Sequence, residues 1–336
     1  MKQRRILMAH GAGGKMMRDL IVDSIFPRLG GTVLRAGEDS AVLAPEAAAK
    51  AWAFTTDAFV VTPLFFPGGD IGRLAVFGTV NDLAAAGAVP RFVSLAFILE
   101  EGLDLEVVER VTESVARAAE EAGVEVVCGD TKVVERGAAD EMFVCTAGLG
   151  VIEGEPARPS RIEPGDAVLL SGTIGDHEMA VLVAREGLPF EAELKSDCAP
   201  LGGLVAQVRG QVCVHAMRDP TRGGLGAALN EMAEQAGVQI EVEEERVPIS
   251  AAVQQACEVL GFDPLYLANE GKMVFFTPEA EAARALATMR HHPLGAQASV
   301  IGRVVAGRPG RVVLNTSVGG RRILDLPLGE QLPRIC

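Results

Sequence analysis

The sequence predicts an α+β fold made of two domains. The chain has 336 residues, which at about 100–200 residues per domain suits two domains of ordinary size. Segments typical of strands and of helices alternate in two sets, and a proline-rich stretch at 153–164 separates the sets. Many expected strands are short and polar at one end, unlike the continuous Val/Ile runs of an all-parallel sheet. We therefore favour a two-domain α+β arrangement over one doubly wound sheet.

The first half is expected to contain one long helix and four strands. A helix is predicted over Leu105–Ala122 because apolar residues recur there at helical spacing, with Glu and Arg between them. Gly123 is a suitable residue to end it. The strands are expected at Ala51–Phe59, Arg91–Ile98, Val124–Val127 and Met142–Val151. The third of these leads directly into Gly129-Asp130.

The second half repeats the alternation. Strands are expected at Asp166–Leu170, Val212–Ala216, Val238–Val242, Lys272–Thr277 and Ser299–Val305. Helices are expected at Asp176–Arg185, Leu225–Ala236, Ala251–Leu260 and Glu279–Arg290. The last eleven residues, LPLGEQLPRIC, contain two prolines and a glycine, which excludes a helix and predicts a flexible tail. We therefore expect domains at 1–155 and 156–325, followed by a tail at 326–336.

Composition limits the classes of function. Acidic side chains number 45 and basic ones 31, a formal net charge of −14, so binding to nucleic acid is not expected. No apolar stretch reaches the ~18 residues of a membrane helix, and the N-terminal segment turns glycine-rich before a signal peptide could form. We therefore expect a cytoplasmic protein without membrane contact. The six cysteines form no CxxC pair, so we expect reduced thiols.

Short motifs that combine glycine with acidic or amide residues indicate an anion site. They begin at His10 (HGAGGK), Gly37 (GEDS), Asn81 (ND), Gly129 (GDTK), Asp219 (DPTRGG) and Asn269 (NEGK). Glycine lets backbone N–H groups approach an anion, and a following helix start adds a favourable dipole, so HGAGGK and DPTRGG are candidate phosphate loops. Neither matches the P-loop or the dinucleotide fingerprint. Each motif alone is also compatible with an ordinary turn, and His10 and His177 with turn or capping residues.

Carboxylates beside these loops predict a magnesium–nucleotide site. They belong to Asp39, Asp57, Asp82, Asp130 and Glu270. Such a set would repel a polyphosphate unless divalent cations lay between them, and Mg²⁺ is usually held by a few carboxylates together with substrate phosphates. The alternative is a set of solvated acidic turns.

Cys336 is the last residue of the chain. By position alone a terminal cysteine is expected to have no role. However, the nine residues from Leu328 span roughly 30 Å when extended, so the thiol could reach both its own site and a partner's. A thiol is a competent nucleophile once deprotonated, which makes Cys336 a candidate carrier or covalent acceptor.

The motifs, in their order, resemble one family. They run from AHGAGGK through CGDTKVVERG, RDPTRGGLG and LANEGK to LPRIC at the end. The whole chain resembles the AIR-synthase-related (PurM-like) ATP-binding superfamily, and within it the hydrogenase maturation factors that act as carbamoyl dehydratases. The terminal Pro333–Cys336 motif is the most specific part of the resemblance.

The resemblance implies an activity and partners. The carbamoyltransferase HypF would load a carbamoyl group onto Cys336, and ATP with Mg²⁺ would then convert it to a thiocyanate. The cyanide would pass to iron on a HypC–HypD scaffold complex, for the [NiFe]-hydrogenase active site. The resemblance also implies a mixed or antiparallel sheet in the N-terminal domain and a sandwich-like α/β C-terminal domain. It further implies a homodimer formed through the N-terminal halves, whose sheets meet across the two-fold axis.

The resemblance also assigns roles to residues. The catalytic residues would be Cys336, Lys132 and Glu270, the last two in proton transfer or in polarising the carboxamide. The nucleotide would be bound by Asp57, Asn81, Thr131, Thr221, Arg222, Gly223 and Gly224. The metal would be bound by Asp39, Asp82 and Asp130. At GEDS the first acid is Glu38, where many relatives have aspartate, so its role stays open.

Two other functions remain as alternatives at this point. One is another ATP-using relative, such as a selenophosphate synthetase or an aminoimidazole ribonucleotide synthetase. A selenophosphate synthetase would have a reactive Cys or selenocysteine near its N-terminal glycine motif, whereas no cysteine precedes Cys128 here. The other is a non-catalytic thiol carrier, which would not need the GDTK, DPTRGG and NEGK motifs.

Overall fold

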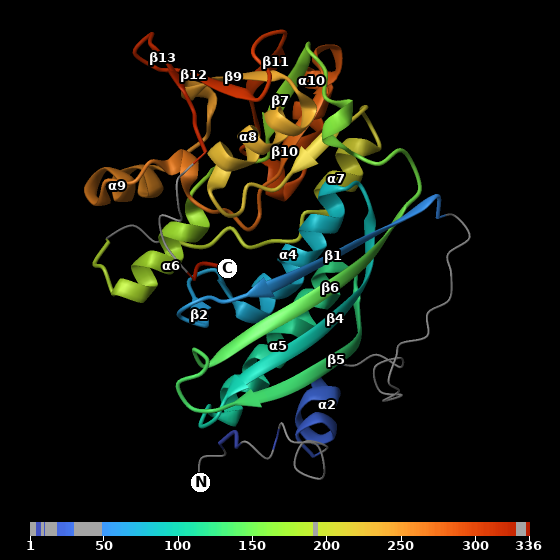
Figure 1. Ribbon diagram of the computed structural model, residues 1–336, viewed down its shortest axis with the longest axis vertical. Helices are drawn as coiled ribbons and strands as arrows, with labels where there is room; N and C mark the ends of the chain where they lie inside the picture. The colour runs from blue at the N-terminus through green and yellow to red at the C-terminus, as the bar shows by residue number, and fades with distance from the viewer. Residues whose placement is uncertain (1–4, 8–9, 11–18, 30–48, 191–193, 327–333) are drawn as a thin grey trace.

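The computed structural model describes residues 5–7, 10, 19–29, 49–190, 194–326 and 334–336. Its N-terminal half contains a four-stranded mixed sheet in the order β1-β6-β4-β5 (Figure 1). β1, β6 and β4 pair antiparallel, whereas β4 and β5 pair parallel. The strands are β1 (Ala51–Phe59), β4 (Val89–Glu100), β5 (Glu125–Val134) and β6 (Met142–Ile152). The expected mixed sheet is thus confirmed.

Two helices cover one face of this sheet. They are α4 (Ile71–Ala85) and α5 (Leu105–Ala122), and their apolar side chains share one core with the sheet. α5 has the predicted bounds, because Asp104 caps its first turn and Gly123 ends it with a left-handed backbone, φ 69°. A short hairpin, β2 (Phe65–Phe66) with β3 (Gly69–Asp70), precedes α4. A π-helical turn, η2 (Leu20–Ile25), and α2 (Phe26–Leu29) lie near α5.

The C-terminal half contains a seven-stranded sheet in the order β13-β12-β9-β11-β7-β10-β8. Only β9 and β12 pair parallel. In chain order, the strands are β7 (Asp166–Leu170), β8 (Ala216–Arg218), β9 (Gln239–Glu243), β10 (Val274–Pro278), β11 (Ser299–Val305), β12 (Arg311–Asn315) and β13 (Arg321–Ile323). All five residues of β7 are buried, which indicates that both faces of the sheet are covered there.

Helices pack on both faces of the seven-stranded sheet. Val168 and Leu170 belong to the core that α8 (Gly224–Ala236) covers. Ala167 and Leu169, on the opposite face, belong to the core of α7 (Gly202–Arg209) and α10 (Glu279–Arg290). The remaining helices, α6 and α9, pack against each other (Figure 1). Their bounds, with those of the 3₁₀ turns, are α6 (Asp176–Glu186), α9 (Ala251–Leu260), η3 (Pro159–Arg161), η4 (Glu244–Arg246), η5 (Pro264–Tyr266) and η6 (Pro293–Gly295).

Two expectations about local structure were wrong. Most of the expected strand Val212–Ala216 is irregular, and only Ala216 belongs to β8. The strand expected at Val124–Val127 is longer, because β5 continues through the GDTK motif and pairs with β4 along its length. Among the described residues, no helix combines the length and apolar composition needed to cross a membrane.

Asn81 joins the two halves at the end of α4. Its Nδ2 donates to the carbonyl oxygens of Ala199, at 3.0 Å, and of Glu270, at 3.1 Å. Its Oδ1 accepts from the backbone N–H of Leu201 at 2.8 Å. The side chain is buried, so these bonds hold the backbone of Glu270 against the N-terminal half where water does not compete.

We expect Asn81→Ala to destabilise the protein by about 3 kcal/mol, because it leaves buried backbone groups without partners at roughly 1–3 kcal/mol each. The measurement is chemical unfolding of the variant and the wild type. The matched control is Asn315→Ala, which removes one half-buried bond to Glu243 and should cost less than about 1.5 kcal/mol. Equal losses in the two variants would contradict this role for Asn81.

Candidate functional site

A cavity of about 230 Å³ lies where the N-terminal half meets loops of the C-terminal half. It combines four carboxylates, two guanidinium groups and a thiol. Its lining residues are Thr56, Asp57, Gly78, Asp82, Arg218, Asp219, Thr221, Arg222, Glu270 and Cys336. Five of them, Asp57, Asp82, Thr221, Arg222 and Glu270, were predicted as site residues with Cys336, and the structure brings these six together.

The N-terminal half supplies Asp57 and Asp82. Alternate residues of β1 are less exposed, and Asp57 is one of them, so its side chain lies on the side of the sheet that faces α4. Asp82, on α4, accepts a hydrogen bond from Thr55 Oγ1 at 2.8 Å. Burial raises the pKa of both carboxyls, and the charge of Asp82 adds to the effect on Asp57. Arg222 opposes the rise of both pKa values.

The C-terminal half supplies Asp219 and the loop that follows it. Burial, and then the charge of Asp82, raises the pKa of Asp219 to about 7, although Arg218 opposes the rise. The loop ends at Gly224, which has φ +62° and begins α8. A Cβ at Gly224 would lie 2.5 Å from the carbonyl oxygen of Leu267. Glycine is therefore required for the loop to lie this close to the segment that leads to Glu270.

Glu270 is the most buried carboxylate of the cavity, with 3% of the residue exposed. Its backbone N–H donates to Asp197 Oδ1 at 3.0 Å, and Asp197 Oδ2 pairs with Lys272 Nζ at 3.0 Å. Burial raises the pKa of Glu270 well above its usual value, and the charges of Asp197 and Asp219 add to the effect. At a given pH this carboxyl therefore binds a proton more readily than a solvated glutamate does.

The end of the chain is held next to these carboxylates. The C-terminus lies near α6 and β2 (Figure 1), and Cys336 is partly buried against the core of the N-terminal half. Ile335 is only 5% exposed, and its carbonyl oxygen accepts from His177 Nε2 at 3.0 Å. The guanidinium of Arg334 pairs with Asp140 at 2.6 Å. The terminal thiol therefore lies within reach of groups that could act on an attached substituent.

Other predicted residues lie elsewhere. Asp130 and Lys132 form an ion pair, 3.4 Å apart, on the exposed face of β5, and Thr131 is buried on the opposite face. Because β5 and β1 are the two edges of the sheet, three strand spacings, or roughly 14 Å, separate them. These three residues therefore do not line the cavity of their own chain.

The remaining predicted residues have other positions. Asn81 lies behind Glu270, where its amide holds the backbone. Gly223 and Gly224 form the loop that begins α8. Asp39, with Glu38 and most of the HGAGGK motif, lies outside the described residues.

Sequence reasoning did not assign Arg218 or Asp219. Both lie at the start of the RDPTRGG segment, which was singled out for its glycines and for Arg222. An aspartate followed by proline is typical of a turn. The position of Asp219 beside Asp82 therefore could not be predicted without the fold.

The donor set of the cavity fits a hard divalent cation. Carboxylate oxygens are the ligands that Mg²⁺ prefers. Here burial raises the pKa of all four carboxyls, and the charges of neighbouring carboxylates add to the rise for Asp57, Asp219 and Glu270. A cation held by Asp57, Asp82 and Asp219 would relieve this repulsion, so the residues present suit the group that the sequence implied.

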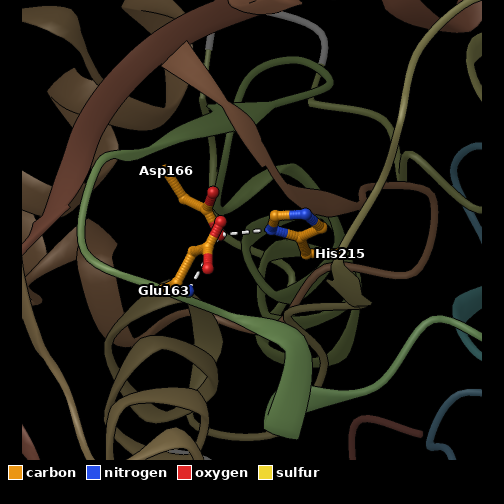
Figure 2. Close-up of side chains that lie close together, drawn as sticks. All are labelled: Glu163, Asp166 and His215. Carbon is orange, nitrogen blue, oxygen red and sulfur yellow. Dashed lines mark hydrogen bonds and ion pairs between the residues drawn. The ribbon is translucent and has the colours of Figure 1, made fainter.

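A second group of possible metal ligands lies apart from the cavity, at the start of β7 (Figure 2). It consists of Glu163, Asp166 and His215. Asp166 is 1% exposed, and its Oδ2 already accepts from the backbone N–H of Glu163, at 3.1 Å, and bonds to His215 Nδ1 at 2.9 Å. These bonds satisfy a buried carboxylate, so we assign this cluster to the stability of the C-terminal half.

Comparison with known proteins identifies relatives over the whole length. The family described as AIR synthase related protein matches twice, with its N-terminal domain at residues 37–152 and its C-terminal domain at 163–315. The carbamoyl dehydratase HypE of Rhodobacter capsulatus is 51% identical over 100% of this chain and 99% of its own.

Two solved structures are also similar. The hydrogenase maturation protein HypE in complex with ATP is 46% identical, with a TM-score of 0.94 over 98% of this chain and 99% of its own. A HypE–HypF complex contains a chain that is 44% identical, with a TM-score of 0.79 over 94% of this chain and 100% of its own.

The carboxylate cluster predicts a pH dependence of stability. Because Asp219 binds its proton more tightly in the folded state, with a pKa of about 7 against 3.8, the free energy of unfolding should fall as pH rises through 7. From pH 6.5 to 8 we expect a loss of about 1 kcal/mol without divalent cations. Chemical unfolding in EDTA measures this loss, and Asp219→Asn should reduce it. A wild-type stability that stays level or rises over this range would contradict the account.

Proposed function

The chain belongs to the AIR synthase related family and, within it, to the HypE carbamoyl dehydratases of hydrogenase maturation, and we propose that its reaction takes place in the cavity described above. The observation that carries this proposal is that Cys336 and Glu270 line one cavity with the carboxylates of Asp57 and Asp82. A carrier that only presented a thiol would gain nothing from burying it among charges of this kind.

The reaction is the ATP-dependent dehydration of an S-carbamoyl group on Cys336. The carboxamide oxygen takes the terminal phosphoryl group of ATP, and ADP leaves. The nitrogen then loses its two protons, the bond from carbon to the phosphate oxygen breaks, and a thiocyanate and inorganic phosphate remain. An amide oxygen is a poor leaving group and phosphate a good one, which is why the dehydration consumes ATP.

Glu270 is our candidate for accepting a proton from the nitrogen. It lines the cavity together with Cys336, so a carbamoyl group on the sulfur would lie beside it. Burial raises its pKa, which makes its ionised form a stronger base than a solvated glutamate. The cation and the guanidinium groups nearby would favour that ionised form.

Other groups of the same cavity suit the transferring phosphoryl group. Arg218 and Arg222 supply positive charge there, and backbone N–H groups at Gly223 and Gly224 begin α8, where an anion is favoured. Bound Mg²⁺ would neutralise charge that develops on the phosphoryl oxygens. Asp57, Asp82 and Asp219 would hold the ion, with Asp39 as a further candidate. The HypE structure that contains ATP supports this choice of nucleotide.

The size of the cavity supports a site for the reacting groups alone and not for the whole nucleotide. At about 230 Å³ it is smaller than the ~300–1,000 Å³ of pockets that enclose a whole drug-sized ligand. It suits the carboxamide and one phosphoryl group, so the adenosine would bind outside it.

We also propose a homodimer through the open face of the N-terminal sheet. Alternate residues of β1 point away from the helices, and among them Trp52 is 44% and Phe54 72% exposed. Large apolar side chains gathered on one sheet face are typical of an interface. Asp130 and Lys132 are on the exposed face of the same sheet. Lys132 of one copy would then act at the cavity of the other.

The partners follow from the reaction. HypF would supply the carbamoyl group, and the HypE–HypF complex among the relatives supports this. A HypC–HypD complex would accept the cyanide, and all of these steps would take place in the cytoplasm.

We expect Glu270→Gln to slow dehydration by about 10²–10⁴-fold while carbamoylation of Cys336 continues, because only the second step needs the base. Intact-mass measurement after incubation with HypF, carbamoyl phosphate and ATP should show the carbamoyl adduct in the variant. In the wild type the adduct should lose the mass of one water. Glu258→Gln, at an exposed position, is the control and should match the wild type. Water loss at the wild-type rate in Glu270→Gln would exclude Glu270 as the base.

Lys132→Ala and Glu270→Gln should complement each other if Lys132 acts across the dimer. Each variant alone is expected to be inactive. When they are mixed under conditions of subunit exchange, half of the dimers are mixed and one of their two sites is intact, so about a quarter of wild-type dehydration should return. Subunit exchange is checked with affinity tags on the two variants. No recovery despite confirmed exchange would place Lys132 in the site of its own chain or outside the reaction.

A further inference from the structure

We propose that four residues form a clamp that holds the end of the chain in the cavity and sets how often Cys336 leaves it; this inference rests on the proposed function. The residues of the clamp are Thr62, Asp140, His177 and Arg185. They bind the two residues before the cysteine, so they are positioning residues for the reaction.

Two carbonyl groups of the tail are held by donors of the clamp. The carbonyl of Arg334 accepts from the backbone N–H of Thr62 at 3.3 Å and from Arg185 Nη2. The carbonyl of Ile335 accepts from His177 Nε2 at 3.0 Å. Because a carbonyl can only accept, Nε2 carries the proton of the ring, and Nδ1 of the neutral ring accepts from the hydroxyl of Ser196 at 2.8 Å. Burial lowers the pKa of His177 and keeps the ring neutral.

The side chain of Arg334 is held by a second contact. Its Nη1 pairs with Asp140 Oδ2 at 2.6 Å, and Thr62 Oγ1 donates to the same oxygen at 2.6 Å. Arg185 Nε donates to the carbonyl of Thr62 at 2.8 Å. The loop after β1, the loop before β6 and α6 thus contact one another at the point where the tail enters.

The docked tail is opposed by its own backbone. Arg334 has φ 58°, a left-handed conformation that is uncommon for a residue other than glycine. The ion pair that holds it is mostly open to solvent, with 55% of the arginine and 35% of the aspartate side chain exposed. Exposed pairs of this kind contribute little. The docked and released positions of the tail therefore differ little in free energy, and a small change shifts their populations.

That balance has a use in the reaction. Dehydration needs the sulfur inside the cavity, whereas loading by HypF and release of the cyanide each need it in the site of another protein. Ile335 is 5% exposed when docked, so a second active site cannot reach Cys336 until the clamp opens. A clamp of moderate strength allows both positions within one catalytic cycle.

The test is the rate at which Cys336 reacts with iodoacetamide in the full-length protein, followed by peptide mass spectrometry. Cys213 is exposed and serves as the internal reference. Asp140→Asn should raise the rate at Cys336 about three- to tenfold and leave Cys213 unchanged, because protection falls with the docked population. Arg334→Gln should give a similar rise, and the double variant should add little to either.

Asp263→Asn is the matched control, because Asp263 pairs with Arg322 at 2.9 Å on another part of the surface and also accepts a backbone N–H. It should leave Cys336 unchanged. Added salt should raise the rate in the wild type but much less in Asp140→Asn, which a general loss of structure would not produce. The double variant Asp140→Arg with Arg334→Asp exchanges the two charges of the pair. Slow labelling of Cys336 in this variant would further support the clamp.

Labelling of Cys336 at equal rates in the wild type and in Asp140→Asn would overturn the clamp. This measurement involves no turnover, so it is separate from the proposed function. If Cys336 is protected from labelling but is never carbamoylated, the proposed function fails and the clamp stands. If Cys336 is carbamoylated and dehydrated but is not protected from labelling, the clamp fails and the proposed function stands.

Discussion

The burial of four carboxylates in one small cavity is the constraint on which the rest of this structure depends. Asp57, Asp82, Asp219 and Glu270 line a space of about 230 Å³. Burial raises the pKa of each, and the charges of neighbouring carboxylates add to the rise for Asp57, Asp219 and Glu270. Such an arrangement opposes folding unless other contacts hold it. Asn81 holds the backbone of Glu270 from the N-terminal half, and the loop that ends at Gly224 fixes the C-terminal side. A cation and a phosphoryl group are the ligands that this arrangement suits.

The cavity gives the terminal cysteine its role. A thiol at the end of a chain has no fixed surroundings by itself, but here Ile335 is buried and the sulfur of Cys336 reaches the carboxylates. The same cavity that repels a polyphosphate without its cation would therefore bring a covalently attached amide next to the proposed base and the proposed phosphoryl site. Attachment replaces binding of a free substrate, and the local concentration of the amide no longer depends on its concentration in solution.

The sequence was informative where local patterns control structure. The amphipathic spacing of α5, with Gly123 after it, predicted the helix to the residue. α4 was missed because twelve of its fifteen residues are buried, so it has no polar face for periodicity to detect. The site residues on α4 and β1 were found from their acidic character, whereas Asp219 and Arg218 needed the fold that brings β8 beside α4. The positions of Asp130 and Lys132 on β5 depend on strand pairing far along the chain, which a single sequence does not specify.

The central claim is that Cys336 carries its substituent beside the carboxylates that we propose to bind the metal. The most direct measurement places Mn²⁺ in the site with ATP absent and records the NMR signal of a ¹³C-labelled carbamoyl group on Cys336. The account predicts that Mn²⁺ broadens this signal strongly in the wild type and that Asp82→Asn removes the effect. A carbamoyl signal that stays sharp while Mn²⁺ is bound would contradict it.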